Sequence, residues 1–174
     1  LWSAMEKTGI STVYQSLVWC ETWMKRVGVS RAVLPLIVVA ENSLGYCDFI
    51  LPLQLRKSHS FRTIEALAAP QTAYAFGLFS PKFLMDQGAP WFRDHLPDVL
   101  ACLPSHDLFH LKDMPEHVCG LANPLLGAQH CSGANQSHVV RLEHNYETFL
   151  AKKRSPDSLR SIRKRDAKLI AAGH

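Results

Sequence analysis

The stretch Arg31-Ala-Val-Leu-Pro-Leu-Ile-Val-Val-Ala-Glu41, followed by Asn42-Ser-Leu-Gly45 and Tyr46-Cys-Asp-Phe-Ile-Leu-Pro-Leu-Gln-Leu-Arg56, decides the fold. Both long runs are rich in apolar and β-branched residues, as strands are, and the four residues between them have the composition of a turn. The sequence therefore predicts a β-hairpin. Phe61–Leu67 predicts a third strand directly after it.

Outward from the hairpin, helical and strand patterns alternate along the chain. An apolar stripe at helical spacing predicts a helix over Thr12–Val27, capped by Ser11 or Thr12 and ended by Gly28. The other predicted elements are a short strand at Leu78-Phe79, a helix over Trp91–Leu103 with a kink or break at Pro97, a strand at Asp107–Lys112, a helix over Pro115–Leu126 and a strand at Ser137–Leu142. The alternation predicts an α/β or α+β fold with one mixed β-sheet flanked by helices.

The end of the chain carries most of its positive charge. A short helix at Tyr146–Leu150 precedes a longer one, which Ser155-Pro156-Asp157 starts with a capping hydroxyl, a proline and an acid. This region supplies eight of the nineteen basic residues: Lys152, Lys153, Arg154, Arg160, Arg163, Lys164, Arg165 and Lys168. Its ordinary interpretation is a solvated face. The absence of aromatic residues among the basic ones argues against nucleic-acid binding.

Composition and cysteine usage indicate a globular protein of the cytoplasm. With 174 residues, 47% hydrophobic and 20% charged, the chain can form one domain or one half of a two-lobed protein. No apolar run approaches the roughly 18 residues of a membrane span, and the start lacks the pattern of a signal peptide. Five widely spaced cysteines favour reduced thiols, most of them in the core.

Motifs for metal binding and catalysis are missing. Histidine and cysteine are concentrated at Cys102, His106, His110, His117, Cys119, His130 and Cys131, but without Cys-x-x-Cys or His-Glu-x-x-His spacing, so we expect no metal. Neither Gly-x-Ser-x-Gly nor a glycine-rich phosphate loop occurs. No catalytic residue can be assigned from such motifs.

The order of the elements resembles the N-terminal half of the GNAT-type acetyltransferases associated with cellulose biosynthesis, relatives of the two-lobed Fem-type aminoacyltransferases. The resemblance rests on a Trp-containing first helix (Trp19 and Trp23), Phe49-Ile-Leu-Pro-Leu-Gln54, the loop leading to Tyr74, His106-Asp-Leu-Phe-His-Leu111 with Asp113-Met-Pro115, and Tyr146-Glu-Thr-Phe-Leu150. It implies a GNAT-like lobe at residues 1–151 and, at 152–174, a basic helix leading to a second lobe that this chain does not contain.

The resemblance also implies a function. The reaction is acyl-CoA-dependent N-acyl transfer, with acetyl-CoA or another acyl-CoA as co-substrate and a small molecule, sugar or peptide as acceptor. In this family the first lobe helps to form the acceptor cleft and the second binds the acyl-CoA. The acceptor-side contacts are then expected from Gln71, Tyr74 and Asp113. The pyrophosphate-binding turn of GNAT enzymes, Arg/Gln-x-x-Gly-x-Gly/Ala, does not occur in the sequence.

Two other hypotheses about the function stay open. The chain can be a non-catalytic binding or scaffold protein whose basic C-terminal helix docks on an acidic partner. It can also be a truncated, inactive product. In that case the apolar seam of the last helix, Leu159, Ile162, Leu169 and Ile170, would be exposed and would make the chain self-associate.

Overall fold

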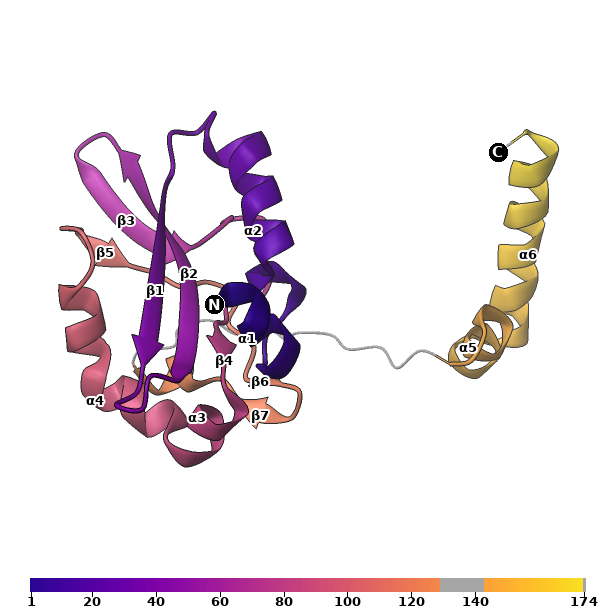
Figure 1. The fold of residues 1–174 in the computed structure, drawn as a ribbon. Coiled ribbons are helices and arrows are strands. Elements are labelled where there is room, and N and C mark those ends of the chain that lie inside the picture. Colours follow the sequence, from indigo (N-terminus) through magenta and orange to yellow (C-terminus); the bar gives the residue numbers. More distant parts are fainter. Residues whose placement is uncertain (129–142, 174) are drawn as a thin grey trace. The chain divides into compact units, whose positions relative to one another are not determined.

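The computed structural model describes residues 1–128 and 143–173, and it has the mixed α/β architecture expected from the sequence (Figure 1). The chain divides into two compact units, Leu1–Asn135 and Gln136–His174. This division groups Tyr146–Lys153 (α5) with the last helix, whereas the sequence suggested a boundary between residues 151 and 152.

A five-stranded mixed sheet organises the first unit. The strands β1 (Leu34–Glu41), β2 (Cys47–Ser58) and β3 (Phe61–Ala66) pair antiparallel in sequence order. Two short strands complete the sheet: β4 (Leu78–Phe79) pairs antiparallel with β2, and β5 (Leu108–Phe109) pairs parallel with β3. The predicted hairpin, the third strand and the short strand at Leu78-Phe79 are confirmed.

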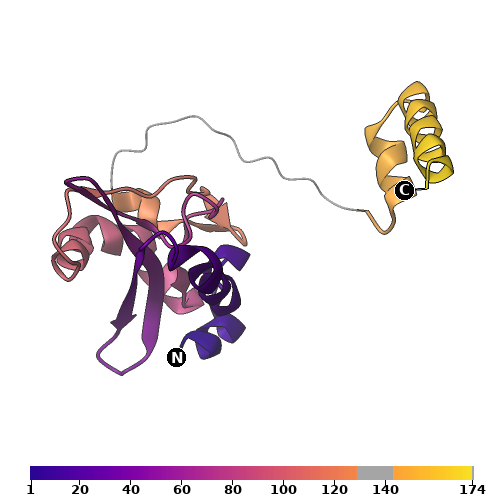
Figure 2. The same ribbon diagram turned by 90° about the horizontal axis from the view of Figure 1, so that it is seen from above.

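Helices cover both faces of the sheet (Figures 1 and 2). Successive residues of a strand point to opposite faces. Phe49, Leu51 and Leu53 of β2 accordingly belong to the main core, which includes aromatic side chains of α3 (Pro81–Asp86) and α4 (Gly88–Ala101). Ile50, on the opposite face of β2, packs in a separate cluster with Met5 of α1 (Trp2–Thr8).

The predicted continuous helix over Thr12–Val27 is wrong, because the segment forms three pieces. These are a 3-10 turn at Val13–Gln15 (η1), an α-helix at Leu17–Trp23 (α2) and a π-helical turn at Met24–Gly28 (η2). Thr12 and Ser16 each accept a hydrogen bond from a backbone N–H and so cap two successive pieces. Their hydroxyls compete with helix propagation, which explains the interruption at Ser16.

The predicted helix over Pro115–Leu126 is also wrong. The segment instead forms the hairpin β6 (His117–Val118) and β7 (Leu121–Ala122), followed by a 3-10 helix at Pro124–Ala128 (η3). Cys119 and Gly120 connect the two strands with φ angles of 52° and 79°. Two consecutive positive φ angles form the two-residue turn that suits a hairpin and cannot occur in an α-helix.

Other expectations were partly met. The helix predicted at Trp91–Leu103 exists as α4, and Pro97 lies inside it without ending it. Pro97 is exposed, so water can hydrate the carbonyl that loses its N–H partner. The strand predicted at Asp107–Lys112 is confined to the two residues of β5. The strand predicted at 137–142 lies outside the described residues.

The second unit contains α5 (Tyr146–Lys153) and α6 (Pro156–Ala171), and both predicted helices are confirmed. Ser155 caps α6 by accepting a hydrogen bond from the N–H of Ser158. The Arg163 guanidinium lies 3.2 Å from the Glu147 carboxylate and links the two helices. Among residues 1–128 and 143–173, no helix combines the length and the apolar character needed to cross a bilayer.

Candidate functional site

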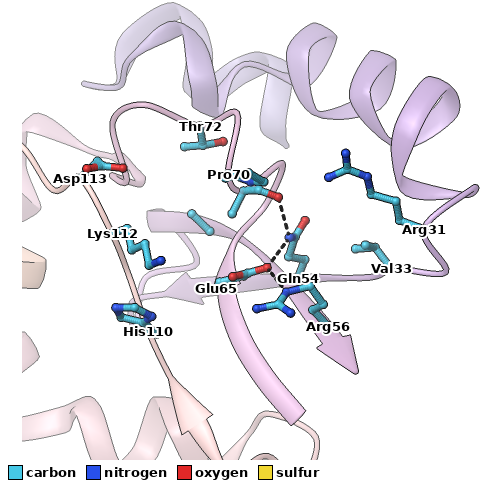
Figure 3. A pocket seen from close by; sticks show the side chains of 12 residues that line it. Arg31, Val33, Gln54, Arg56, Glu65, Pro70, Thr72, His110, Lys112 and Asp113 are labelled. Carbon is cyan, nitrogen blue, oxygen red and sulfur yellow. Dashed lines mark hydrogen bonds and ion pairs between the residues drawn. The ribbon is translucent and has the colours of Figure 1, made fainter. Parts of the chain in front are cut away.

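A pocket of about 240 Å³ opens on one face of the sheet in the first unit (Figure 3). It lies where β3 ends and where the chain leaves β5, at the carboxyl ends of the parallel strand pair. Ligands of α/β sheets commonly bind at such ends. The pocket is lined by Arg31, Val33, Gln54, Arg56, Glu65, Ala66, Ala69, Pro70, Thr72, His110, Lys112 and Asp113.

A row of three polar residues crosses the sheet at the pocket. Gln54 of β2 pairs with Glu65 of β3, and the register of Ile64 with Phe109 places His110 beside Glu65. Gln54 is fully buried within the run Phe49–Leu55 of β2, in which the other residues are apolar. Buried polar groups are costly unless they are hydrogen-bonded, so its partners matter.

Gln54 is hydrogen-bonded at both ends of its amide. Its Nε2 donates to Glu65 Oε1 at 2.9 Å and to the Ala69 carbonyl at 3.3 Å. Its Oε1 accepts from the Ala68 N–H at 3.0 Å. This single side chain therefore fixes both the carboxylate of the pocket and the loop that forms one of its walls.

The Glu65 carboxylate is held in place by two donors. In addition to Gln54 Nε2, the Arg56 Nε donates to Glu65 Oε1 at 2.9 Å. Only 12% of the Glu65 side chain is exposed, against 49% for Arg56. Hydrogen bonds to an ionised carboxylate are stronger than neutral ones, and together they offset part of the cost of burying this charge.

Basic side chains enter the pocket from opposite walls (Figure 3). Arg31 comes from the turn between η2 and β1, where its N–H bonds to the Val27 and Gly28 carbonyls at 3.2 Å. His110 and Lys112 follow β5. Within the described part of the chain, neither Arg31 nor Lys112 forms an ion pair. Arg31 and Lys112 therefore bring to the two walls positive charge that no carboxylate of residues 1–128 and 143–173 pairs with.

Only one of the three residues that the sequence suggested as acceptor contacts lines the pocket. Asp113 lines the pocket, and its carbonyl accepts from the Ala75 N–H at 3.1 Å. Gln71 and Tyr74 are not among the lining residues. Gln71 Oε1 accepts from Trp23 Nε1 at 3.2 Å, and the Tyr74 ring lies edge-on to Tyr14. An acceptor contact by any of the three stays a prediction.

Most of the pocket was not anticipated from the sequence. Arg31, Glu65 and Lys112 come from three distant segments, and no motif joins them. One signal was present: Gln54 stands inside the run Phe49–Leu55, in which the other members are apolar. A polar residue at the centre of a buried strand indicates a hydrogen-bonded site, because an unpaired amide there would be destabilising.

Burial raises the pKa of two thiols, Cys20 and Cys47, so neither of them is an activated nucleophile. Burial, and to a lesser extent the nearby Glu6 carboxylate, raises the pKa of the Cys20 thiol to about 12. Cys47 is partly buried and packs against a core cluster, whereas Cys102 and Cys119 are exposed, so two of the four described cysteines contribute to the core. A raised pKa keeps a thiol protonated and unreactive.

No group of three or more potential metal ligands occurs within residues 1–128 and 143–173. His130 and Cys131, which belong to the concentration of histidine and cysteine in the sequence, lie outside the described residues.

The second unit presents a basic and apolar helix surface. Arg160, Lys164 and Lys168 follow one another at intervals of four residues on α6. At the end of the helix, Leu169 and Ile170 are 54% and 73% exposed. Leu159 and Ile162 are less exposed, so only the last part of the apolar seam is open to solvent.

The chain was compared with protein-family models, curated proteins and solved structures, and none of them matched. The resemblance to GNAT-type acetyltransferases therefore stays a prediction from the sequence.

Proposed function

We propose that the unit Leu1–Asn135 is the acceptor-binding lobe of a GNAT-type acyltransferase, which transfers an acyl group from acyl-CoA to an amine. The observation that supports this proposal best is the small charged pocket at the carboxyl ends of β3 and β5. Its carboxylates, Glu65 and Asp113, can accept hydrogen bonds from the amine of an acceptor. The resemblance in the order of the elements supplies the class of reaction.

The size of the pocket favours an acceptor over the acyl donor. A volume of about 240 Å³ is below the roughly 300–1,000 Å³ of sites for drug-sized ligands, and coenzyme A is larger than those ligands. In the proposal, a second GNAT-like lobe binds the acyl-CoA. The amine nitrogen attacks the thioester carbonyl, the carbon–sulfur bond breaks, and the sulfur leaves as a thiolate, which finally takes up the proton that the amine releases. His110 is the candidate acceptor of the amine proton, because it lines the pocket and an imidazole nitrogen can act as a general base.

The cytoplasm is the proposed location, because it keeps thiols reduced and supplies acyl-CoA. Cys20, Cys47, Cys102 and Cys119 are free thiols in the structure, which is compatible with this location.

The proposal is tested with the full-length protein that the gene encodes. That protein is incubated with acetyl-CoA and a panel of amines, amino sugars and short peptides, and acetylated products are identified by mass spectrometry. We expect Asp113→Asn to raise the KM of the acceptor about fivefold to tenfold, the effect of losing one charged hydrogen bond. Asp98→Asn, an exposed position on α4 outside the pocket, is the matched control. Lack of any acetylated product would contradict the proposal.

A second candidate function is docking on an acidic protein through α6. Leu169 and Ile170 are exposed beside basic side chains, a combination that suits a partner with both apolar and acidic groups. We expect association with polyglutamate that weakens as salt rises and that Lys164→Gln with Lys168→Gln reduces. Binding that is unaffected by salt or by these substitutions would remove this candidate.

A further inference from the structure

We infer that two copies of this chain associate through β1, which pairs antiparallel with β1 of the second copy about a twofold axis at Val38. This inference concerns one edge of the sheet and does not depend on the proposed function. Three features of β1 support it: its single neighbour in the sheet, the direction of its backbone groups, and the apolar side chains exposed along it.

β1 has a neighbouring strand on one side only. Within the described residues it pairs with β2 alone and ends the strand order β1-β2-β3-β5 (Figure 1). Proteins usually protect such an edge with lysines, inward-pointing charges, prolines or bulges. From Leu34 to Ala40, β1 contains no charged residue, and Pro35 is its only proline. The centre of the strand is therefore open to pairing with another strand.

The hydrogen bonds of β2 show which backbone groups of β1 face the free side. The Pro52 carbonyl accepts from the Leu67 N–H at 3.0 Å, so the backbone of Pro52 is directed toward the β3 side. Directly opposite residues of an antiparallel pair either bond to each other or both point away. Ile37 lies opposite Pro52, so its N–H and C=O point away from β2, and the same holds two residues later for Val39.

Large apolar side chains are exposed along β1 and beside both of its ends. Ile37 and Val39 are 42% and 43% exposed. The full set is Val29, Leu34, Ile37, Val39, Leu44 and Tyr46, which is half of the exposed large apolar side chains among residues 1–128. Their exposed parts amount to roughly 600 Å² per copy, against about 800 Å² per partner in a standard interface. This area suits a dimer of moderate affinity.

The distribution of apolar side chains and charge favours a second copy in antiparallel orientation. This orientation brings the start of one strand beside the end of the other. The apolar side chains at the start, Val29 and Leu34, then lie toward those of the hairpin tip, Leu44 and Tyr46, in the second copy. The charges also match, because a basic residue precedes β1 at position 31 and an acidic residue ends it at position 41.

The outward-facing backbone groups determine the register. With the axis at Val38, Ile37 lies opposite Val39 of the second copy, and the N–H and C=O of each bond to the other. An axis at Ile37 would place Val39 opposite Pro35, which has no N–H to donate. An axis at Val39 would shorten the overlap of the two strands. Val38 is therefore the position that pairs the outward groups best.

Analytical ultracentrifugation of the chain under reducing conditions measures the association. We expect a monomer–dimer equilibrium with a Kd of about 10–100 μM. Ile37→Lys adds a charge to the edge, and Val39→Pro removes an N–H that does not bond to β2, so each should weaken the dimer at least about tenfold. Two controls should leave it unchanged: Val18→Lys, at an exposed position of α2, and Leu169→Gln with Ile170→Gln, which removes the exposed apolar end of α6.

Disulfide formation tests the register without blocking the edge. Cys102, Cys119 and Cys131 are first replaced by serine. Val38→Cys should then link two copies under mild oxidation, because opposite residues that do not bond to each other have Cα atoms about 4.5 Å apart, within the range of a disulfide. Ala40→Cys is the matched control, since its two copies would lie about 13 Å apart along the strands.

Four results would overturn the inference. They are a monomer at about 500 μM, a dimer that neither β1 substitution weakens, a dimer that the double substitution in α6 abolishes, and equal linking of Val38→Cys and Ala40→Cys. Circular dichroism shows whether the variants are folded, and if Ile37→Lys and Val39→Pro both unfold, the comparison of the two cysteine variants decides. The proposed acyl transfer is judged separately, because none of these measurements involves a substrate.

Discussion

Replacing Gln54 by leucine should destabilise the first unit strongly, although the two side chains have similar volumes. Gln54 is fully buried and hydrogen-bonds to the Ala68 N–H, the Ala69 carbonyl and the Glu65 carboxylate. Leucine would fill the same space and satisfy none of these groups. Ala68 is itself fully buried, so its N–H would have no access to water.

The expected loss of stability can be estimated from these contacts. A buried backbone N–H without an acceptor costs about 1–3 kcal/mol. The loss of one donor to Glu65 adds about 1 kcal/mol, because Arg56 remains and the carboxylate is 12% exposed. Leucine is more apolar than glutamine and recovers about 1 kcal/mol by its burial. The net decrease in the free energy of unfolding is about 1–3 kcal/mol.

Urea unfolding followed by tryptophan fluorescence measures this change. Trp2, Trp19, Trp23 and Trp91 are the four tryptophans of the chain, and all of them belong to the first unit. With a slope of about 2 kcal/mol/M, the midpoint of Gln54→Leu should fall by about 0.5–1.5 M. Gln87→Leu, at an exposed position whose side chain makes no capping bond, should shift it by less than about 0.3 M. Equal midpoints for both variants would refute the reasoning.

Two further predictions concern thiol reactivity and close packing. A thiol reagent at pH 8 should label Cys102 and Cys119 in the native protein and Cys20 only after unfolding. Mass spectrometry of the peptides identifies the labelled cysteines. Labelling of Cys20 in the native protein would contradict its burial. Burial raises the pKa of Cys20 from 9.0 in the unfolded chain to about 12 in the folded one. Above pH 9 only the unfolded chain loses this thiol proton, so the free energy of unfolding should decrease as the pH rises. Gly77→Ala would place a methyl group 2.6 Å from the buried Leu51 side chain. It should lower the free energy of unfolding by about 1–3 kcal/mol in the same urea assay. An unchanged midpoint would show that the core moves to accommodate the methyl group.

Patterns within one segment predicted the sheet well. The hairpin and the third strand followed from long apolar runs separated by turn residues, and α6 followed from its cap. Two predicted helices were wrong because of local features that an apolar stripe at helical spacing does not reveal. Ser16 began a new capped helix in the middle of one stripe, and Cys119 with Gly120 reversed the chain in the middle of another.

The pocket was less accessible to sequence analysis because its residues meet only after the strands pair. The parallel pairing of β3 with β5 joins residues more than forty positions apart and brings His110 beside Glu65. Hydrophobic periodicity predicts which face of a strand is buried, but it does not predict which strands become neighbours. Gln54 could be noticed from the sequence, whereas its partners could not.

The two walls of the pocket differ in how many backbone hydrogen bonds hold them. β2 and β3 pair over six residue positions, whereas β5 pairs with β3 over only two, with added bonds from His110 and Asp107 to the β3 strand. Segments with few such bonds open locally without unfolding of the whole domain. The segment carrying His110, Lys112 and Asp113 should therefore exchange its amide hydrogens faster than β2, and an occupied pocket should slow that exchange most strongly there. Part of the free energy of ligand binding would then be used to order this wall.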